Sequence, residues 1–344
     1  MELAVGFILY KENSAQYLAE FLPSLRAALK FLPTSEYRIY AFDNSPLNDK
    51  SNELIIDRFN RENSALGLKI EYQRAADGIN QGFGRAYNRL IEQAVRDGAC
   101  YFFMINPDTV LDAATISELV KAMEVEKVRK DSPSDCPDSQ ELAVAVPKIR
   151  RWDFAGHQRT EIIDSCGLIQ KIGLRFKDLG QGEKDEGQYD HLAPGKIISA
   201  SGAAGLFRLS ALEKIKEKGQ YFDERFFMYR EDCDLALRLN RIGGVARLVS
   251  TALIYHDRTA ASSGRGLFRA LQDRFKKSRQ VRSWSHLSEL LIYVKHWKSQ
   301  NLVSQSVIII RILFIFIFSL ILEQFNLKNY SLAYRIFKDS SGID

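Results

Sequence analysis

The first third of the chain alternates between short apolar runs and longer stretches with helical periodicity. The apolar runs, rich in β-branched and aromatic residues, predict strands at 3–10, 37–43, 68–73 and 101–105. Apolar positions three and four residues apart predict helices at 15–32, 51–63 and 83–98. Strands that alternate with helices form a mostly parallel sheet flanked by helices. We therefore predict an α/β fold of the Rossmann-like kind.

Polar or glycine-rich segments follow each predicted strand, at 10–13, 43–45, 77–84 and 106–108. In open α/β sheets, ligands bind beyond the carboxyl ends of the strands. The pattern therefore predicts a ligand crevice along this edge of the sheet. Dinucleotide-binding dehydrogenases carry G-x-G-x-x-G after the first strand, where this chain has KENSAQ, so that class is disfavoured.

Candidate catalytic and metal-binding groups follow one another along the chain. Asp108 ends the segment INPD, Asp232 opens a predicted helix, and His256 ends the apolar run 246–256. A carboxylate at a strand end can hold Mg²⁺ or Mn²⁺ against a diphosphate, although Asn, Pro and Asp are also common turn residues. Asp234 and Arg238 lie four residues apart on the predicted helix, which favours a structural ion pair.

Six segments in order resemble the inverting family 2 glycosyltransferases of the GT-A fold, particularly their rhamnosyltransferase-like branch. These segments are GFILYKEN, AFDNSP, GINQGFGRAYNRLI, INPD, SASGAAGLFRLSAL and FDERFFMYREDCDLALRL. The resemblance covers residues 3 to about 260. It implies a GT-A domain at 1–264, with a nucleotide-sugar half at 1–110 and an acceptor half at 111–264.

The resemblance also implies roles for the acid pair in YREDCD. Asp232 would be the general base for the acceptor hydroxyl, a contribution of roughly 10²–10⁴-fold. Glu231 would orient the site or contact the acceptor. The acceptor side would further include Ser201, Gly202 and Tyr229.

On the donor side, the resemblance implies contacts from Tyr10, Asp43, Asn44, Asn80, Gly82, Gly84 and Asn106. Asp43 would accept the N3–H of uracil or thymine, so the donor would be a UDP- or dTDP-linked sugar. Asp108 and His256 would bind a divalent cation, Mg²⁺ or Mn²⁺. Asn106 stands at the first position of the family's D-x-D metal motif, as is common in the rhamnosyltransferase-like branch.

The remaining residues, 265–344, form a predicted helical C-terminal tail of different composition. Nine lysines and arginines lie between 265 and 298, followed by an apolar run at 307–322. That run is short for a membrane-spanning helix, which needs about 20 residues. Basic, aromatic and apolar residues together predict attachment to a membrane surface through 265–325. Packing against the catalytic domain or in a homodimer is the alternative, and nucleic acid is disfavoured because no recognition module is present.

Composition, cysteine usage and the N-terminal residues predict where in the cell the protein is located. The chain has 344 residues, 46% of them hydrophobic, and a formal charge of only +5, which does not by itself indicate nucleic acid. Four widely spaced cysteines without a C-x-x-C pair are typical of free thiols in a reducing cytosol. No basic, cleavable leader precedes the first predicted strand. We expect a cytoplasmic protein that is peripheral on the inner face of the cell membrane.

Together these features predict a glycosyltransferase that moves a sugar, rhamnose being the first choice, from a nucleotide diphosphate with inversion. The acceptor would be a saccharide or a polyprenyl-linked saccharide in cell-surface polysaccharide synthesis. Two alternatives belong to other classes. One is a non-catalytic nucleotide-sugar-binding or assembly protein. The other is a nucleotidyltransferase of related fold, which would need a G-x-G-T-R-like loop that this chain lacks after its first strand.

Overall fold

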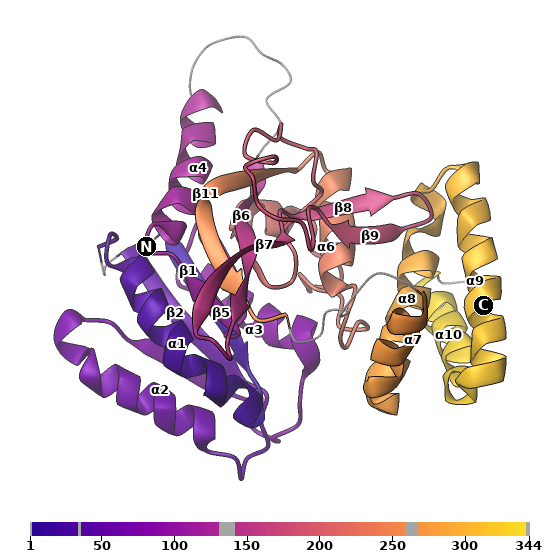
Figure 1. Cartoon of the computed structure of the whole chain (residues 1–344), viewed down its shortest axis with the longest axis horizontal. Helices are drawn as coiled ribbons and strands as arrows, with labels where there is room; N and C mark the ends of the chain where they lie inside the picture. Colours follow the sequence, from indigo (N-terminus) through magenta and orange to yellow (C-terminus); the bar gives the residue numbers. More distant parts are fainter. Residues whose placement is uncertain (1, 34–35, 131–141, 259–266, 342–344) are drawn as a thin grey trace.

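The computed structural model describes residues 2–33, 36–130, 142–258 and 267–341 (Figure 1). Its strands are β1 (Leu3–Leu9), β2 (Tyr37–Asp43), β3 (Ile70–Arg74), β4 (Tyr101–Ile105), β5 (Thr109–Leu111), β6 (Leu142–Asp153), β7 (Gln158–Ser165), β8 (Leu168–Lys171), β9 (Arg175–Asp178), β10 (Ala204–Arg208) and β11 (Val245–His256). Its helices are α1 (Lys11–Leu29), α2 (Ser51–Glu62), α3 (Gly82–Arg96), α4 (Thr115–Lys130), α5 (Leu209–Lys214), α6 (Glu231–Arg241), α7 (Leu267–Lys276), α8 (Arg279–His296), α9 (Leu302–Leu322) and α10 (Lys328–Ser341).

One curved sheet organises residues 3–256, which we call the catalytic part after the role that the sequence predicts for it. Its strand order is β3-β2-β1-β4-β10-β6-β11-β5, with β7 paired to β6. The four predicted strands are β1 to β4, and they pair in parallel as expected. The second half is mixed, because β10 runs antiparallel between β4 and β6, and β11 pairs antiparallel with β5. The predicted α/β fold class, GT-A-like and with C-terminal helices, is confirmed, and the sheet is parallel mainly in its first half.

Helices cover both faces of this sheet because alternate strand residues point to opposite sides. In β1, Phe7 packs edge-on against Phe21 of α1, with ring centroids 5.0 Å apart. On the opposite face, Phe102 of β4 packs against Tyr87 of α3, with centroids 6.2 Å apart. The first core contains α1, α2 and α4, and the second contains α3, α5 and α6. Loops and the first residues of helices lie at the carboxyl-terminal ends of β1, β2 and β4.

The C-terminal helices pack on α6 and form a third layer beyond it (Figure 1). Cys233 and Leu237 of α6 share an apolar cluster with Leu291 of α8, Ile308 of α9 and Ala333 of α10. The predicted boundary between 264 and 265 lies outside the described residues, and the division at 110 stays a prediction. Because α6 begins with the acid pair, the C-terminal helices support the helix that carries the predicted base.

Candidate active site

The segment 201–203 is hydrogen-bonded both to the residue after β4 and to the first turn of α6. Asn106, just after β4, donates its N–H to the carbonyl of Ala203 at 2.8 Å. Gly202 donates its N–H to Oδ2 of Asp232 at 3.1 Å. These bonds arise because β10 pairs antiparallel with β4 and starts where β4 ends, with Ala204 opposite Ile105. Segments separated by about 125 residues in sequence therefore meet at one edge of the sheet.

Asp232 is held at the first turn of α6 by two backbone donors. Besides Gly202, the N–H of Cys233 donates to Oδ1 at 2.8 Å. The chain enters the helix through two left-handed residues, Tyr229 at φ 71° and Arg230 at φ 68°. Non-glycine residues rarely adopt this conformation, and it persists only where neighbouring groups hold it. The strained turn thus fixes the direction in which the acid pair leaves the backbone.

Helix α8 holds this turn from the C-terminal side. Trp284 packs on Phe227 with ring centroids 4.4 Å apart, and the Ser288 hydroxyl donates to the carbonyl of Met228 at 2.9 Å. The ammonium group of Lys277 lies 5.7 Å from the ring centre of Tyr229. The predicted acceptor-side residue Tyr229 is therefore half-buried between the catalytic part and the C-terminal helices.

Two buried polar atoms beside Asp232 have no hydrogen-bond partner among the described residues. They are the Ser201 hydroxyl and Oε2 of Glu231. Burial and the neighbouring Asp232 raise the pKa of Glu231 to about 8, so its carboxyl group is protonated at neutral pH. Buried polar groups without partners are costly, and in a cleft they commonly meet a ligand. Both atoms are suited to a hydroxyl-rich molecule.

Replacing Glu231 by glutamine should remove a pH-dependent loss of stability. The pKa is higher in the folded than in the unfolded chain, so this carboxyl group stabilises the fold at low pH and loses that contribution as the pH rises. Between pH 5 and 8 the loss is on the order of 3 kcal/mol. Urea unfolding of wild type and Glu231→Gln at both pH values measures it. An unchanged difference between the two proteins would contradict the raised pKa.

His256 lies between two carboxylates at the end of β11. Its Nε2 is 3.4 Å from Asp108 Oδ2, and its Nδ1 is 2.8 Å from Asp164 Oδ2. Burial disfavours the imidazolium, but the two carboxylates outweigh it and raise the pKa of His256 to about 10. Arg258 pairs with the far side of Asp164 at 3.2 Å. The sequence predicted the pair Asp108 and His256, and the pairing of β11 with β5 brings them together.

Asp164 and Arg258 are neighbours of this pair that the sequence reasoning missed. Asp164 is 1% exposed and is the last residue but one of β7. A carboxylate directly after two isoleucines (EIIDSC) is the one signal that could have marked it. A carboxylate on Nδ1 directs the other imidazole nitrogen towards its target, as is usual behind metal-binding histidines.

Asp108 and His256 suit a divalent cation as two of its ligands. The cation would displace the proton from Nε2 of His256, because only a neutral imidazole coordinates a metal. Oδ1 of Asp108 is buried and has no partner among the described residues, so it has an unused acceptor. No group of three or more His, Cys, Asp or Glu that could hold a metal ion occurs in the described ranges. Mg²⁺ is usually bound by one or two carboxylates together with substrate phosphates and water. This donor set therefore fits a cation that a diphosphate helps to hold.

The predicted base-binding residues gather at the ends of β1 and β2. Tyr10 directly precedes α1, and its N–H donates to the Ser14 hydroxyl at 2.7 Å. Asp43 is fully buried, and its oxygens accept from Ser45 N–H at 2.8 Å and from the Tyr72 hydroxyl at 2.6 Å. Its contact with a pyrimidine base stays a prediction that requires Tyr72 to move aside.

Asn44 and Asn80 stabilise the loop before α3. The Asn44 side chain accepts from Gln81 N–H at 3.0 Å and donates to the Gly82 carbonyl at 3.1 Å. The side chain of Asn80 accepts from the N–H of Gly82 at 2.8 Å. Their closeness to a diphosphate stays a prediction, since each has a structural role within the loop.

Packing explains both glycines of α3. At Gly82, which has φ 75°, an added Cβ would lie 2.5 Å from the carbonyl oxygen of Phe227. At Gly84 it would lie 3.1 Å from Cβ of Phe222. The N–H of Gly82 is already bonded to Asn80. The glycines therefore let α3 approach the 222–227 segment closely, a reason different from the diphosphate contact that the resemblance implied.

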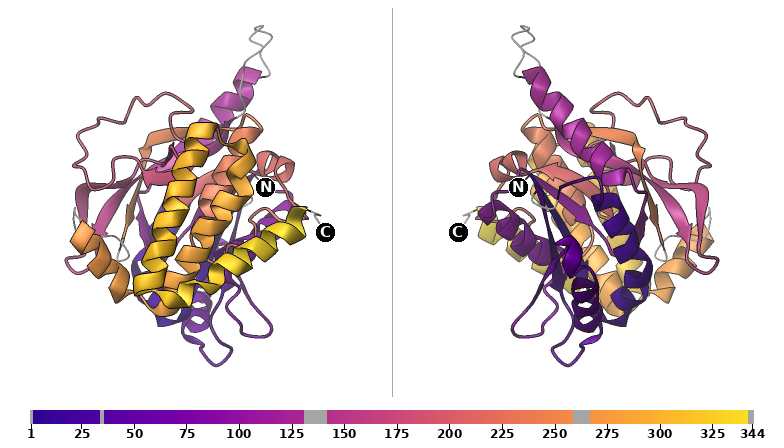
Figure 2. Two further views of the ribbon diagram at one scale, coloured as in Figure 1. Left: turned by 90° about the vertical axis from the view of Figure 1, so that its right-hand side faces the viewer. Right: turned by 90° about the vertical axis from the view of Figure 1, so that its left-hand side faces the viewer.

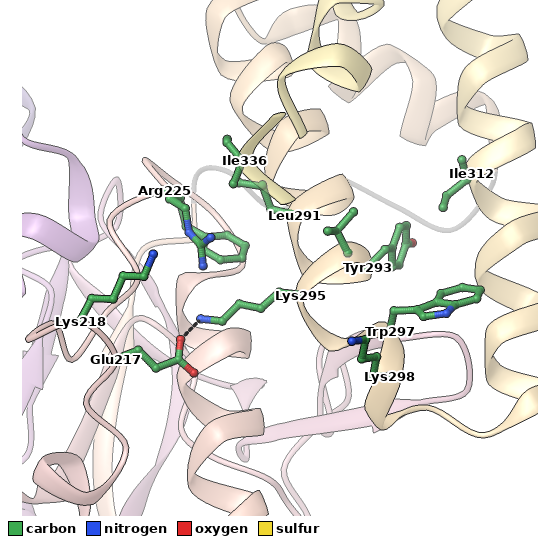
Figure 3. Close-up of a pocket in the computed structure, with 12 residues that line it drawn as sticks. Glu217, Lys218, Arg225, Leu291, Tyr293, Lys295, Trp297, Lys298, Ile312 and Ile336 are labelled. Carbon is green, nitrogen blue, oxygen red and sulfur yellow. Dashed lines mark ion pairs between the residues drawn. The ribbon is translucent and has the colours of Figure 1, made fainter. Parts of the chain in front are cut away.

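A cavity of about 660 Å³ lies between the 217–226 segment and the C-terminal helices (Figure 3). Its walls include Phe226, Leu291, Trp297, Ile312 and Ile336, and none of the predicted site residues lines it. The ion pair of Lys295 with Glu217, at 2.8 Å, crosses it. The cavity is thus separate from the site around Asp232.

Comparisons with known proteins add a family. The profile described as Glycosyl transferase family 2 matches residues 5–215. Structures of TarS from S. aureus are similar to this chain: one has 13% identity and a TM-score of 0.47, covering 86% of this chain and 44% of that chain. Another, TarS 1–349 in complex with UDP-GlcNAc, has 14% identity and a TM-score of 0.46, covering 90% and 79%.

The chain therefore spans less than half the length of the longer TarS chain that it matches. No curated protein matches the chain. The family profile covers most of the chain. It includes α3, β4, β10 and most of β1, and it ends before α6, which carries Asp232. On this match, the protein belongs to glycosyl transferase family 2.

Proposed function

We propose that the protein transfers a sugar from a UDP- or dTDP-linked donor to a saccharide or polyprenyl-linked saccharide with inversion. Rhamnose is the first donor sugar to test. The observation that carries the proposal is the position of Asp232, fixed by two backbone N–H groups beside the segment that follows β4. The acceptor would be assembled into cell-surface polysaccharide at the cytoplasmic face of the membrane.

In the proposed reaction, Asp232 accepts the proton of an acceptor hydroxyl. At the same time the oxygen of that hydroxyl forms a bond to the anomeric carbon of the donor sugar. The bond from that carbon to the diphosphate breaks, and its electron pair goes to the diphosphate oxygen. An alcohol attacks efficiently only as its proton is removed, which a positioned carboxylate can do. Ser201 and the protonated Glu231, whose Oγ and Oε2 have no partner in the described part of the chain, would bind other hydroxyls of the acceptor.

Asp108 and His256 would hold a divalent cation, which neutralises charge on the leaving diphosphate when bound. Asp164 keeps His256 oriented through its Nδ1. Different segments thus act on the two ends of the reaction. The segment 106–108 and His256 would stabilise the leaving diphosphate, and Asp232 would remove the proton of the attacking hydroxyl. Inversion requires such a division, because base and leaving group lie on opposite sides of the anomeric carbon.

Thermal unfolding with a panel of nucleotide sugars tests the proposal. A ligand at 100 times its Kd should stabilise the native state by about 2.7 kcal/mol. We expect one dTDP- or UDP-sugar to raise the Tm, and product analysis to show inverted anomeric configuration. Donor binding without any turnover on saccharide or lipid-linked acceptors would favour the non-catalytic binding protein instead.

Asp108→Ala should abolish the Mn²⁺-dependent part of the donor's effect on Tm. The substitution removes the one carboxylate of the proposed metal pair and leaves His256 bonded to Asp164. The same thermal measurement, with and without Mn²⁺, checks it. The exchange Asp112→Ala, at a partly exposed ion pair with Arg159, is the matched control. Equal metal responses in both variants would overturn the assignment of Asp108.

A further inference from the structure

Helix α9 presents an unusually apolar surface. It is 21 residues long, its mean hydropathy reaches 2.5, and only 11% of its most apolar window is buried. Its length extends five residues before the predicted run at 307, so by length and composition it could cross a membrane. Ile310, Phe314, Ile317 and Ile321 form a row along one side and are 54–70% exposed. Contiguous exposed apolar surfaces of this kind mark interaction sites.

From Val307 onwards, the polar side chains of α9, Arg311 and Ser319, contact α8. Ser306, near the N-terminal end, is exposed, and its hydroxyl donates to the carbonyl of Leu302. Arg311, its one charged residue, pairs with Glu289 at 2.5 Å and with the Tyr293 hydroxyl at 2.7 Å, both on α8. The Ser319 hydroxyl lies 3.2 Å from His286 of α8. At the N-terminal end, the Ser304 hydroxyl accepts from Gly173 N–H at 3.0 Å. The helix is thus fastened along its length on one side only.

This attachment fixes the orientation of α9 relative to any surface it contacts. Figure 2 (left) shows α8, α9 and α10 lengthwise on one end of the molecule, with the side of α9 facing outward. Directly after α9, Glu323 is 1% exposed and pairs with Arg274 and Arg282. To span a bilayer, about 31 Å of helix would have to leave α8 and these ion pairs. Contact through its side requires no such separation.

The charge distribution selects an anionic lipid surface over a second copy of the chain. Residues 265–344 carry 13 lysines and arginines against five acids, whereas the preceding 264 residues carry 35 against 38. Exposed Lys298 and Lys328 lie just beyond the two ends of α9. A second copy would bring the same positive region against itself, while anionic lipids attract such residues by about 1 kcal/mol each.

We infer that α9 lies flat in the interfacial layer of an anionic bilayer, with Ile310, Phe314, Ile317 and Ile321 inserted and the flanking lysines at the phosphates. Amphipathic helices with an apolar side and basic neighbours bind membranes in this way. The inference concerns binding alone and rests on the proposed function only for its biological purpose. It accounts for how an enzyme could reach a lipid-linked acceptor without a spanning segment.

Vesicle flotation of the full chain tests this inference. We expect the protein to float with vesicles of phosphatidylcholine and phosphatidylglycerol, and much less with phosphatidylcholine alone or in high salt. The double variant Ile310→Glu/Phe314→Glu should bind about 100-fold more weakly, because two apolar side chains lose their burial. The matched control is Leu54→Glu/Phe31→Glu, whose wild-type side chains are equally exposed, at 63% and 64%, but belong to the catalytic part.

Equal flotation of the two double variants, or no flotation of wild type with anionic vesicles, would overturn the inference. Sedimentation velocity without lipid supplies a second measurement. A concentration-dependent dimer that Ile310→Glu/Phe314→Glu dissolves would assign this surface to a second copy and likewise overturn it. Unchanged unfolding curves verify that both variants fold. Failure of flotation with intact transfer to a soluble acceptor would leave the proposed function standing, so the two ideas fail separately.

Discussion

Asp232→Asn is expected to lower turnover by about 10²–10⁴-fold while leaving donor binding nearly unchanged. Asparagine has almost the shape of aspartate and can still accept the hydrogen bond from Gly202 N–H, but its amide nitrogen cannot accept the second one, from Cys233 N–H. It cannot take a proton from the acceptor hydroxyl at neutral pH. Steady-state transfer rates and donor-induced changes in Tm measure the two effects separately.

The matched control is Asp97→Asn. Asp97 directly follows the C-terminal end of α3, away from the site, and the substitution makes the same chemical change. It should transfer sugar at the wild-type rate. Retained turnover in Asp232→Asn would remove the general-base assignment. A simultaneous loss of donor binding would indicate that Asp232 holds the site together instead.

Asp234→Ala is expected to destabilise the protein by about 3–5 kcal/mol, since it leaves buried cations without their counter-charge. Asp234 is fully buried and accepts from Arg238 Nε at 2.9 Å, Lys295 Nζ at 2.8 Å and His296 Nε2 at 2.8 Å. Desolvation lowers the pKa of His296, and its Nδ1 accepts from Arg241, as in a neutral ring. Urea unfolding measures the loss.

Glu71→Ala is the matched control, because it breaks an exposed ion pair with Arg38. Such surface pairs contribute only about 0–1 kcal/mol. Equal losses in the two variants would show that the cluster around Asp234 contributes no more than a surface pair. We further expect Asp234→Ala to reduce turnover, since Lys295 and His296 fasten α8, and α8 holds the turn before Asp232.

Local sequence patterns were sufficient for the first half of the fold. The runs at 37–43 and 101–105 coincide with β2 and β4, because continuous apolar residues between polar ends specify both the type and the limits of a buried strand. The bounds of α1 were less well predicted: a helix was expected at 15–32, and α1 begins at Lys11 and ends at Leu29. The later mixed pairing could not be read from such runs, since strand direction depends on connections between distant segments.

The sequence predicted which residues belong to the candidate site, but not how most of them are arranged in space. The predicted ion pair of Asp234 and Arg238 is confirmed, because helical spacing alone places them together. Asp108 and His256 do lie together, although their roles stay proposals. The second carboxylate beside His256, Asp164, comes from β7, and no spacing rule links it to His256. Likewise, Gly82 and Gly84 were expected near a diphosphate, and they allow close packing against 222–227.

The sequence by itself determined local features. These are which segments of the first third of the chain form strands and which form helices, the acid pair at the start of a helix, and the apolar and basic composition of the C-terminal tail. Each follows from periodicity or composition within about 20 residues. Only the tertiary structure decided which of these segments meet. It alone could bring Gly202 to Asp232, turn Arg311 towards Glu289 and expose the opposite side of α9. The physical reason is that burial and ion pairing depend on neighbours far along the chain, which no local pattern encodes.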